Sequence, residues 1–334
     1  MNTFGRIFKI SIFGESHGES TGVIIDGCPA GISLSATDLA DDLTRRRPGA
    51  KGTTGRIEKD MPQIKSGLFK GFTTGSPILI EFTNENTVSS DYLKYKTVPR
   101  PGHVDFIAAK KHSDYNDHRG GGHFSGRITV GLVAAGVIAK KILRGVIFKT
   151  SLIEVGGEKN YKELVDETAK SGDSLGGIIE CRIDHLPLCL GEPFFYSAES
   201  ALSHILFAIP SVKGVEFGTG FGSSLMKGSD YNDALIDSTG KTKTNNSGGI
   251  TGGLTNGNQL VFRVAMRPPS SIAKKQTAYD LIRSEIASIS IDGRHDVCPA
   301  LRAAVIVEAA ASIALCDLYL LSKCNSNNGN IMQI

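Results

Sequence analysis

The sequence predicts an α+β fold with helices inside and sheets outside, in one large domain. Two segments, residues 127–143 and 299–321, are long and apolar on nearly every face of a helix, so each needs cover on all sides. Alternating segments elsewhere predict the strands that would cover them. No Gly/Ser-rich linker divides the 334 residues, so we assign 1–323 to this domain and 324–334 to a flexible tail.

The strands are predicted by short alternating patterns at 6–13, 22–26, 178–184 and 260–266. Residues 50–100 mix further alternating runs with turns, which indicates more strands and a mobile loop. The polar stretch 84–98 within them is a candidate lid over a site.

Two shorter helices accompany the long ones. Ser35 and Asp38 resemble a capping box, which predicts a helix that ends near Arg46, and residues 199–209 form the other. The segment 299–321 is long enough to span a bilayer, but three charged side chains interrupt it. We therefore expect a central core helix there.

The composition limits the classes of function. A net charge of +3 gives no general grip on nucleic acid. The six cysteines show no CxxC pair or metal-type spacing, which indicates reduced thiols and no metal site. The N-terminus lacks the apolar core of a signal peptide, so we expect a cytoplasmic protein that makes no use of a membrane.

The most informative block is Gly14-Glu15-Ser16-His17-Gly18, which follows the first predicted strand. It places a carboxylate, a hydroxyl and an imidazole side by side, and histidine exchanges protons near neutral pH. The flanking glycines allow close backbone approach. The block indicates chemistry on a bound ligand, although a turn with a solvated histidine would show the same five residues.

Two further polar blocks lead into the long helices. Glycines at 120–122 precede the first of these helices, whose N-terminal N–H groups favour an anion, and Arg119 and Arg127 would add two-pronged donors. Asp296 precedes the last helix. It is either a helix cap or a base held at the helix N-terminus, and the residues alone leave both readings open.

Eight blocks, in order and with matching spacing, resemble the chorismate synthase family over residues 4–323. They are Gly14-Glu-Ser-His-Gly18, Arg45-Arg-Arg-Pro-Gly49, Arg100-Pro-Gly-His-Val-Asp105, Arg119-Gly-Gly-Gly122 with Ser125-Gly-Arg127, Val212-Lys-Gly-Val-Glu216, Gly248-Gly-Ile-Thr-Gly-Gly253, Arg267-Pro-Pro-Ser-Ser271 and Gly293-Arg-His-Asp296. The resemblance implies a lyase of the shikimate pathway that converts 5-enolpyruvylshikimate 3-phosphate to chorismate and phosphate by anti-1,4-elimination. It also implies a need for reduced FMN, a β-α-β sandwich of antiparallel sheets with internal pseudo-symmetry, and a homotetramer.

The resemblance implies a role for each matching residue. His17, with Ser16 as a relay, would protonate or hydrogen-bond the flavin or the leaving phosphate. His103 would be the second catalytic histidine. Ser125 and Asp296 would form a second relay, in which Asp296 helps the flavin to accept the ring proton. The implied flavin contacts are His123, Phe124, Ser125, Pro210, Ser211, Gly252, Arg267, Pro268, Pro269, Ser270, Ser271 and Arg294, and Arg46 matches an NADP position of some members.

Two departures from the family pattern bear on these roles. Phe124 stands where many members have a hydroxyl, and Gly52 stands near a position that is commonly basic. The second departure, with the absence of large insertions, favours a member that takes reduced flavin from elsewhere, with NADPH only as an external reductant. Two alternatives stay open: a flavin reductase, and a non-catalytic module that binds a polyanion or nucleotide.

Overall fold

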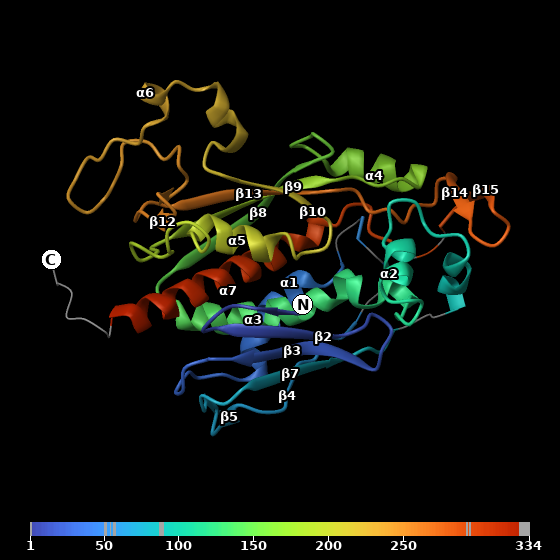
Figure 1. The fold of residues 1–334 in the computed structure, drawn as a ribbon, viewed down its shortest axis with the longest axis horizontal. Coiled ribbons are helices and arrows are strands. Elements are labelled where there is room, and N and C mark those ends of the chain that lie inside the picture. The colour runs from blue at the N-terminus through green and yellow to red at the C-terminus, as the bar shows by residue number, and fades with distance from the viewer. Residues whose placement is uncertain are drawn as a thin grey trace.

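Two antiparallel sheets flank a central group of helices (Figure 1), in a computed structural model that describes residues 2–49, 52–53, 55, 58–86, 90–291, 293 and 295–326. Helix α3 packs against β3 and β7 of one sheet, and α7 packs against β8 and β9 of the other. The prediction of a mixed fold of helices and sheets in a single chain is confirmed.

The first sheet has the strand order β1-β2-β3-β7-β4, with β1 (Thr3–Phe4), β2 (Lys9–Gly14), β3 (Ser20–Asp26), β7 (Ile78–Thr83) and β4 (Gln63–Ile64). The second has the order β10-β13-β9-β8, with β10 (Val212–Phe217), β13 (Leu260–Met266), β9 (Gly177–Asp184) and β8 (Ile147–Val155). Three hairpins complete the described strands: β5 (Leu68–Phe69) with β6 (Phe72–Thr73), β11 (Ile250–Thr251) with β12 (Leu254–Thr255), and β14 (Gln276–Asp280) with β15 (Glu285–Ile289).

The α-helices are α1 (Ala40–Arg46), α2 (Asp105–Lys111), α3 (Thr129–Ile142), α4 (Lys162–Ser171), α5 (Ala198–Leu206), α6 (Gly228–Tyr231) and α7 (Ala300–Ser326). Five 3₁₀ turns join them in the described part: η1 (Ala36–Leu39), η2 (Ser90–Lys96), η3 (Arg119–Phe124), η4 (Gly126–Ile128) and η5 (Gly220–Leu225).

The predicted elements agree with these except at their ends. The four predicted strands are β2, β3, β9 and β13. The capping box is confirmed, since the backbone N–H of Ser35 donates to the Asp38 carboxylate at 2.7 Å, but it opens the 3₁₀ turn η1 before α1 begins. Helix α7 continues to Ser326, past the predicted boundary of the domain at 323, and residues 327–334 lie outside the described part.

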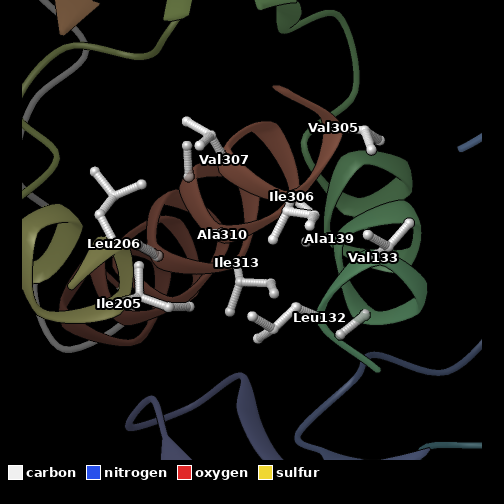
Figure 2. Close-up of a cluster of buried hydrophobic side chains, with 14 of the residues drawn as sticks. Leu132, Val133, Ala139, Ile205, Leu206, Val305, Ile306, Val307, Ala310 and Ile313 are labelled. Atoms are coloured by element: carbon white, nitrogen blue, oxygen red, sulfur yellow. The ribbon is translucent and has the colours of Figure 1, made fainter. Parts of the chain in front are cut away.

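Helices α3 and α7 lie side by side at the centre of the hydrophobic core (Figure 2). Leu132 of α3 lies beside Ile313 of α7 in this view. A Cβ atom on Gly136 would lie 2.4 Å from the Cβ and 2.6 Å from the Cα of Ala309. Only glycine therefore fits at this position, and its absence of a side chain sets the distance between the two helices.

Asp317 of α7 anchors the N-terminal segment. Its fully buried carboxylate accepts the backbone N–H groups of Arg6, Ile7 and Phe8 at 2.7–3.0 Å, and the hydroxyl of Tyr196 also donates to it. Four donors compensate for the lost hydration of the charge. The start of β2 is thus fixed against the core helix through its main chain.

Glu308 of α7 joins three helices. Its carboxylate accepts hydrogen bonds from Nη1 and Nη2 of Arg45 at 3.0 and 2.8 Å, and from Nζ of Lys140 at 2.8 Å. Burial acts to raise the pKa of Glu308, but the bonds from Arg45 and Lys140 outweigh it and hold the pKa below its ordinary value of 4.5.

These partners explain how α7 lies in a protein core despite its charges. In the described part of the chain it is the one helix long and apolar enough to cross a membrane. In the structure, 78% of its most apolar 18-residue window is buried inside the protein. The expectation of a central core helix is confirmed.

Gly136→Ala should lower the free energy of unfolding by about 1–3 kcal/mol, because the new methyl group overpacks the contact with Ala309. This would occur although alanine favours a helix by ~1 kcal/mol over glycine. Gly228→Ala in α6 is the matched control, since a Cβ there meets no atom within 4 Å. Equal stability of the two variants in chemical denaturation would contradict the close approach.

The pKa of Glu308 predicts a pH dependence. Because its folded-state pKa lies below the unfolded value, its charge stabilises the protein above the unfolded pKa, and this contribution is lost as pH falls through the folded pKa. Glu308→Gln should therefore lose less stability than the wild type on acidification between about pH 5 and 3. Chemical denaturation at several pH values measures this, and parallel curves would contradict it.

Candidate active site

A cleft of about 300 Å³ lies where the N-terminal ends of α3 and α7 meet the loops that follow β2, α5 and β13. Five arginines line it, Arg46, Arg100, Arg127, Arg267 and Arg302, against three carboxylates, Glu58, Asp60 and Asp296. The excess of positive charge favours an anionic ligand.

A buried carboxylate holds two of these arginines together. Asp60 is 3% exposed and accepts from Nη1 of Arg46 at 3.1 Å with one oxygen and from Nη1 of Arg127 with the other. Nε of Arg127 donates to Asn84 at 2.8 Å, while its Nη2 is buried and has no hydrogen-bond partner among the described residues. A buried donor without a partner is costly, so this group calls for an acceptor from a ligand.

Crowding of positive charge is visible at Arg46. Burial, together with the nearby Arg302 and Arg127, lowers the pKa of Arg46 to about 9, although Asp60 opposes the shift. Nε and Nη2 of Arg46 donate to Thr129 and to the carbonyls of residues 126 and 127. A bound anion would relieve the repulsion between the guanidinium groups.

The other two arginines of the run at 45–47 do not line the cleft. Arg45 pairs with Glu308 in the core, and Arg47 donates to the carbonyl of Lys59. Arg119, which was predicted to bind an anion, does not line the cleft either. Its guanidinium forms a two-pronged pair with the carboxylate of Asp117, with both N–O distances at 2.8 Å.

His103 lines the cleft and belongs to a tight polar group. Its Nδ1 lies 2.6 Å from Oδ1 of Asp105, and Arg100 binds the same carboxylate through Nε and Nη2, both at 2.8 Å. Nη1 of Arg100 donates to Ser271 at 3.1 Å. The guanidinium also lies over the ring of Tyr95, 4.7 Å from its centre.

The side chains of Ser16 and His17 pack against Gly120 in the glycine-containing turn η3. A Cβ on Gly120, which has a φ of 59°, would lie 2.7 Å from both Ser16 Oγ and His17 Nε2. Glycine is therefore required here, and it brings both polar atoms to one point. Ser16 lines the cleft, while His17 lies behind it, 7% exposed and packed edge-on against Tyr92.

Ser125 and Asp296 lie before the N-terminal ends of different helices and both line the cleft. Ser125 Oγ accepts from the backbone N–H of Arg127 at 3.3 Å, so it also caps η4. Asp296 binds Arg302 in a two-pronged pair, with Nε–Oδ1 at 3.1 Å and Nη2–Oδ2 at 2.7 Å. The fold brings these two residues of the predicted second relay to one cleft.

Most residues predicted to contact a flavin line the cleft: Phe124, Ser125, Pro210, Ser211, Arg267, Pro269, Ser270 and Ser271. Three do not. His123 donates from Nδ1 to the carbonyl of Gly14 at 2.7 Å, and Pro268 is not among the residues that line the cleft, although Arg267 and Pro269 are. Gly252 lies in the β11–β12 turn near the N-terminal end of α5, whereas the cleft follows the other end of that helix (Figure 1). Arg294 lies outside the described residues.

The candidate lid is only partly described. Residues 87–89 lie outside the described part, and 90–96 form η2, from which Tyr92 lines the cleft. Asn84 donates to the carbonyls of Glu15 and Gly18 at 3.0 and 2.9 Å, so the segment starts against the first glycine block. Its function as a lid stays a prediction.

Sequence reasoning missed the residues that organise the charges. Asp60 and Arg302 lie outside every motif, and no local pattern marks them. Arg100 and Asp105 stand in the block at 100–105, whose Arg-x₄-Asp spacing around a histidine was the available signal. Among the described residues, no group of three or more His, Cys, Asp or Glu side chains could hold a metal ion.

Comparisons with known proteins give a consistent result. The family model described as chorismate synthase matches residues 8–320. A chorismate synthase of Chitinophaga pinensis is 54% identical over 324 residues, which cover 97% of this chain and 98% of the relative. That of Dehalococcoides mccartyi is 42% identical and covers 96% of each chain. A solved chorismate synthase crystal structure, 23% identical, shares the fold with a TM-score of 0.73 over 95% of this chain and 93% of its own.

Asp60→Asn should lower the free energy of unfolding by about 3–5 kcal/mol, because it leaves two buried guanidinium groups without their counter-ion. Asparagine tolerates the φ of 48° at this position, so the backbone is not the cause. Asp173→Asn, in a half-exposed pair with Lys274, should cost less than about 1 kcal/mol. Similar losses for the two variants in denaturation would contradict a central role for Asp60.

Proposed function

The chain belongs to the chorismate synthase family and is a lyase that forms chorismate and phosphate from 5-enolpyruvylshikimate 3-phosphate; we propose that the arginine-lined cleft is its active site. The observation that carries the proposal is Arg127, whose buried Nη2 lacks an acceptor among the described residues in a cleft where arginines outnumber carboxylates. The substrate carries a phosphate and two carboxylates, which are the partners that guanidinium groups bind best.

The reaction is an elimination without net oxidation or reduction. The bond between a ring carbon and the phosphate oxygen breaks, a ring proton is lost from the opposite face, and a second ring double bond forms. The protein must therefore hold the departing phosphate, position the ring and manage one proton. The cleft offers arginines for the first task and Ser16, His103, Ser125 and Asp296 for the last.

Ser16 and His17 form the proposed first proton-handling pair. Ser16 lines the cleft and would touch the ligand, while His17 lies behind it and contacts the cleft through Ser16 and Gly120. In this arrangement the hydroxyl carries a proton between the ligand and the imidazole. His103 is the second proposed catalytic histidine, because it lines the cleft directly.

Ser125 and Asp296 form the proposed second relay. The two-pronged pair with Arg302 orients the Asp296 carboxylate at the cleft wall and supports its role as the residue that assists removal of the ring proton. Ser125 reaches the same cleft from the other helix, which supports its role as the connecting hydroxyl.

Reduced FMN, which the family generally requires, would supply electron density to the substrate as phosphate leaves. The residues present fit such a group: five arginines against three carboxylates in the cleft leave enough positive charge for a second phosphate beside that of the substrate. The residues proposed to hold it are Phe124, Ser125, Pro210, Ser211, Arg267, Pro269, Ser270 and Ser271. His123, Pro268, Gly252 and Arg294 are not needed for this placement.

The remaining family properties are part of the proposal. Each sheet packs on one long helix, α3 or α7, which supports two pseudo-symmetric halves of a β-α-β sandwich. Exposed large apolar side chains, such as Phe194, Phe195 and Phe221, support assembly into a homotetramer. The protein would work in the cytoplasm with reduced flavin from elsewhere. Nε and Nη2 of Arg46 already donate to protein acceptors, which leaves little of this guanidinium for a bound NADPH. NADPH would therefore act only as an external reductant.

Anaerobic turnover tests the proposed function. With pre-reduced FMN, the protein should release phosphate from 5-enolpyruvylshikimate 3-phosphate while the flavin absorbance shows that it stays reduced. His17→Ala should lower kcat by roughly 10²–10⁴-fold, because it removes one proton-handling group, while flavin binding measured by fluorescence persists.

His204→Ala is the matched control, since His204 is exposed on α5 outside the cleft lining, and it should keep the wild-type rate. Reduction of oxidised FMN by NADPH, without phosphate release in the anaerobic assay, would favour a flavin reductase. Ligand binding without phosphate release would favour a binding module, and either result would overturn the lyase assignment.

A further inference from the structure

Asp105 has no role in the reaction described so far, yet it touches a residue that does. It is the first residue of α2, and its side chain is 7% exposed. It does not line the cleft, whereas His103, two residues earlier, does. Any effect of Asp105 on the ligand must therefore act through another side chain.

The short contact between the two residues fixes where the imidazole carries its hydrogen. His103 Nδ1 and Asp105 Oδ1 are 2.6 Å apart. Nη2 of Arg100, which can only donate, also lies 3.0 Å from Nδ1, so this atom meets one donor and one acceptor. A carboxylate oxygen only accepts, and its contact with Nδ1 is the shorter by 0.4 Å, which favours Nδ1 as the donor to Asp105. In the neutral imidazole the lone pair then lies on Nε2. That atom lies on the side of Gly121, where a Cβ would be 3.7 Å away, and His103 itself lines the cleft.

Arg100 keeps Asp105 in its charged form. It donates to both carboxylate oxygens from Nε and Nη2 at 2.8 Å, and its backbone N–H adds a third bond at 3.2 Å. Burial acts to raise the pKa of Asp105, but the bonds from Arg100 and His103 outweigh it and hold the pKa well below its ordinary value. The charged carboxylate can only accept a hydrogen bond from Nδ1.

We propose that Asp105, clamped by Arg100, is a positioning residue that fixes His103 as the Nδ1–H tautomer and so presents Nε2 to the ligand as a proton acceptor. This inference rests on the proposed function of the cleft. The competing interpretation is that Asp105 only anchors Arg100, which reaches the cleft and Ser271. If Asp105 positions His103, loss of the carboxylate changes the tautomer of His103. If Asp105 only anchors Arg100, the loss changes ligand binding alone.

The tautomer can be read without any change to Asp105. In protein labelled with ¹⁵N at histidine, one- and multiple-bond ¹H–¹⁵N correlations distinguish protonated from unprotonated ring nitrogens. The signal that disappears in His103→Gln belongs to His103. A protonated Nδ1 with an unprotonated Nε2 at neutral pH supports the proposal, and a proton on Nε2 overturns it.

Kinetics of Asp105→Asn give the second test. If Asp105 positions His103, kcat should fall by about 10²-fold with KM little changed, since an amide can also stabilise the other tautomer. Asp105→Glu should restore part of the rate. Asp117→Asn is the matched control, because Asp117 forms the same two-pronged pair with Arg119 outside the cleft.

The outcomes separate this inference from the proposed function. A raised KM with unchanged kcat in Asp105→Asn, or a wild-type rate, would overturn the positioning role while the lyase assignment stands. If the wild type itself releases no phosphate, the proposed function fails, and the tautomer spectrum still reports on the His103–Asp105 pair. Circular dichroism and thermal unfolding show whether each variant is folded before its rate is compared.

Discussion

The close contact between α3 and α7 at Gly136 and Ala309 is the constraint on which the rest of the structure depends. Each helix carries one sheet, so their separation sets the spacing of the layers. Both helices also present their N-terminal ends to the same cleft, α3 with Ser125 and Arg127, and α7 with Asp296 and Arg302. A contact in the core thereby determines how far apart the charged groups of the site stand.

The site concentrates positive charge in a chain whose net charge is only +3. Three carboxylates, Asp60, Asp105 and Asp296, offset part of the repulsion between the arginines, because each accepts hydrogen bonds from one or two of them. These pairs orient the guanidinium planes before any ligand arrives, which lowers the cost of ordering them on binding. Among the arginines that line the cleft in the described part, the buried donor without a hydrogen-bond partner is Nη2 of Arg127.

Features that depend on neighbouring residues in the sequence could be predicted, and features that depend on residues far apart in the sequence could not. The strand before Ser16, the capping box at Ser35 and the core position of α7 depend on local patterns, and they were predicted. The resemblance singled out Arg46, but the physical reason that Arg46 lines the cleft and Arg45 does not is which face of α1 meets Glu308, far away in the sequence. Asp60 acts only through its place between two distant arginines, so no pattern around it could show its role. His123 matches a family position, but here its ring binds the carbonyl of Gly14 outside the cleft.

The anchoring of the N-terminal segment by Asp317 has a consequence for sequence drift. The carboxylate accepts hydrogen bonds from the backbone N–H groups of Arg6 and Ile7, and the side chains at these positions take no part in those bonds. Substitutions at Ile7 can accumulate without breaking these bonds, with proline as the exception because it has no N–H to donate. Arg6 is less free to change, because its guanidinium lies 4.0 Å from the centre of the Tyr196 ring, and Tyr196 also donates to Asp317. The opposite holds for Asp317, where a single change removes every bond at once. Mutational tolerance is therefore unequal across this contact: broad in the segment between β1 and β2 and narrow on the helix.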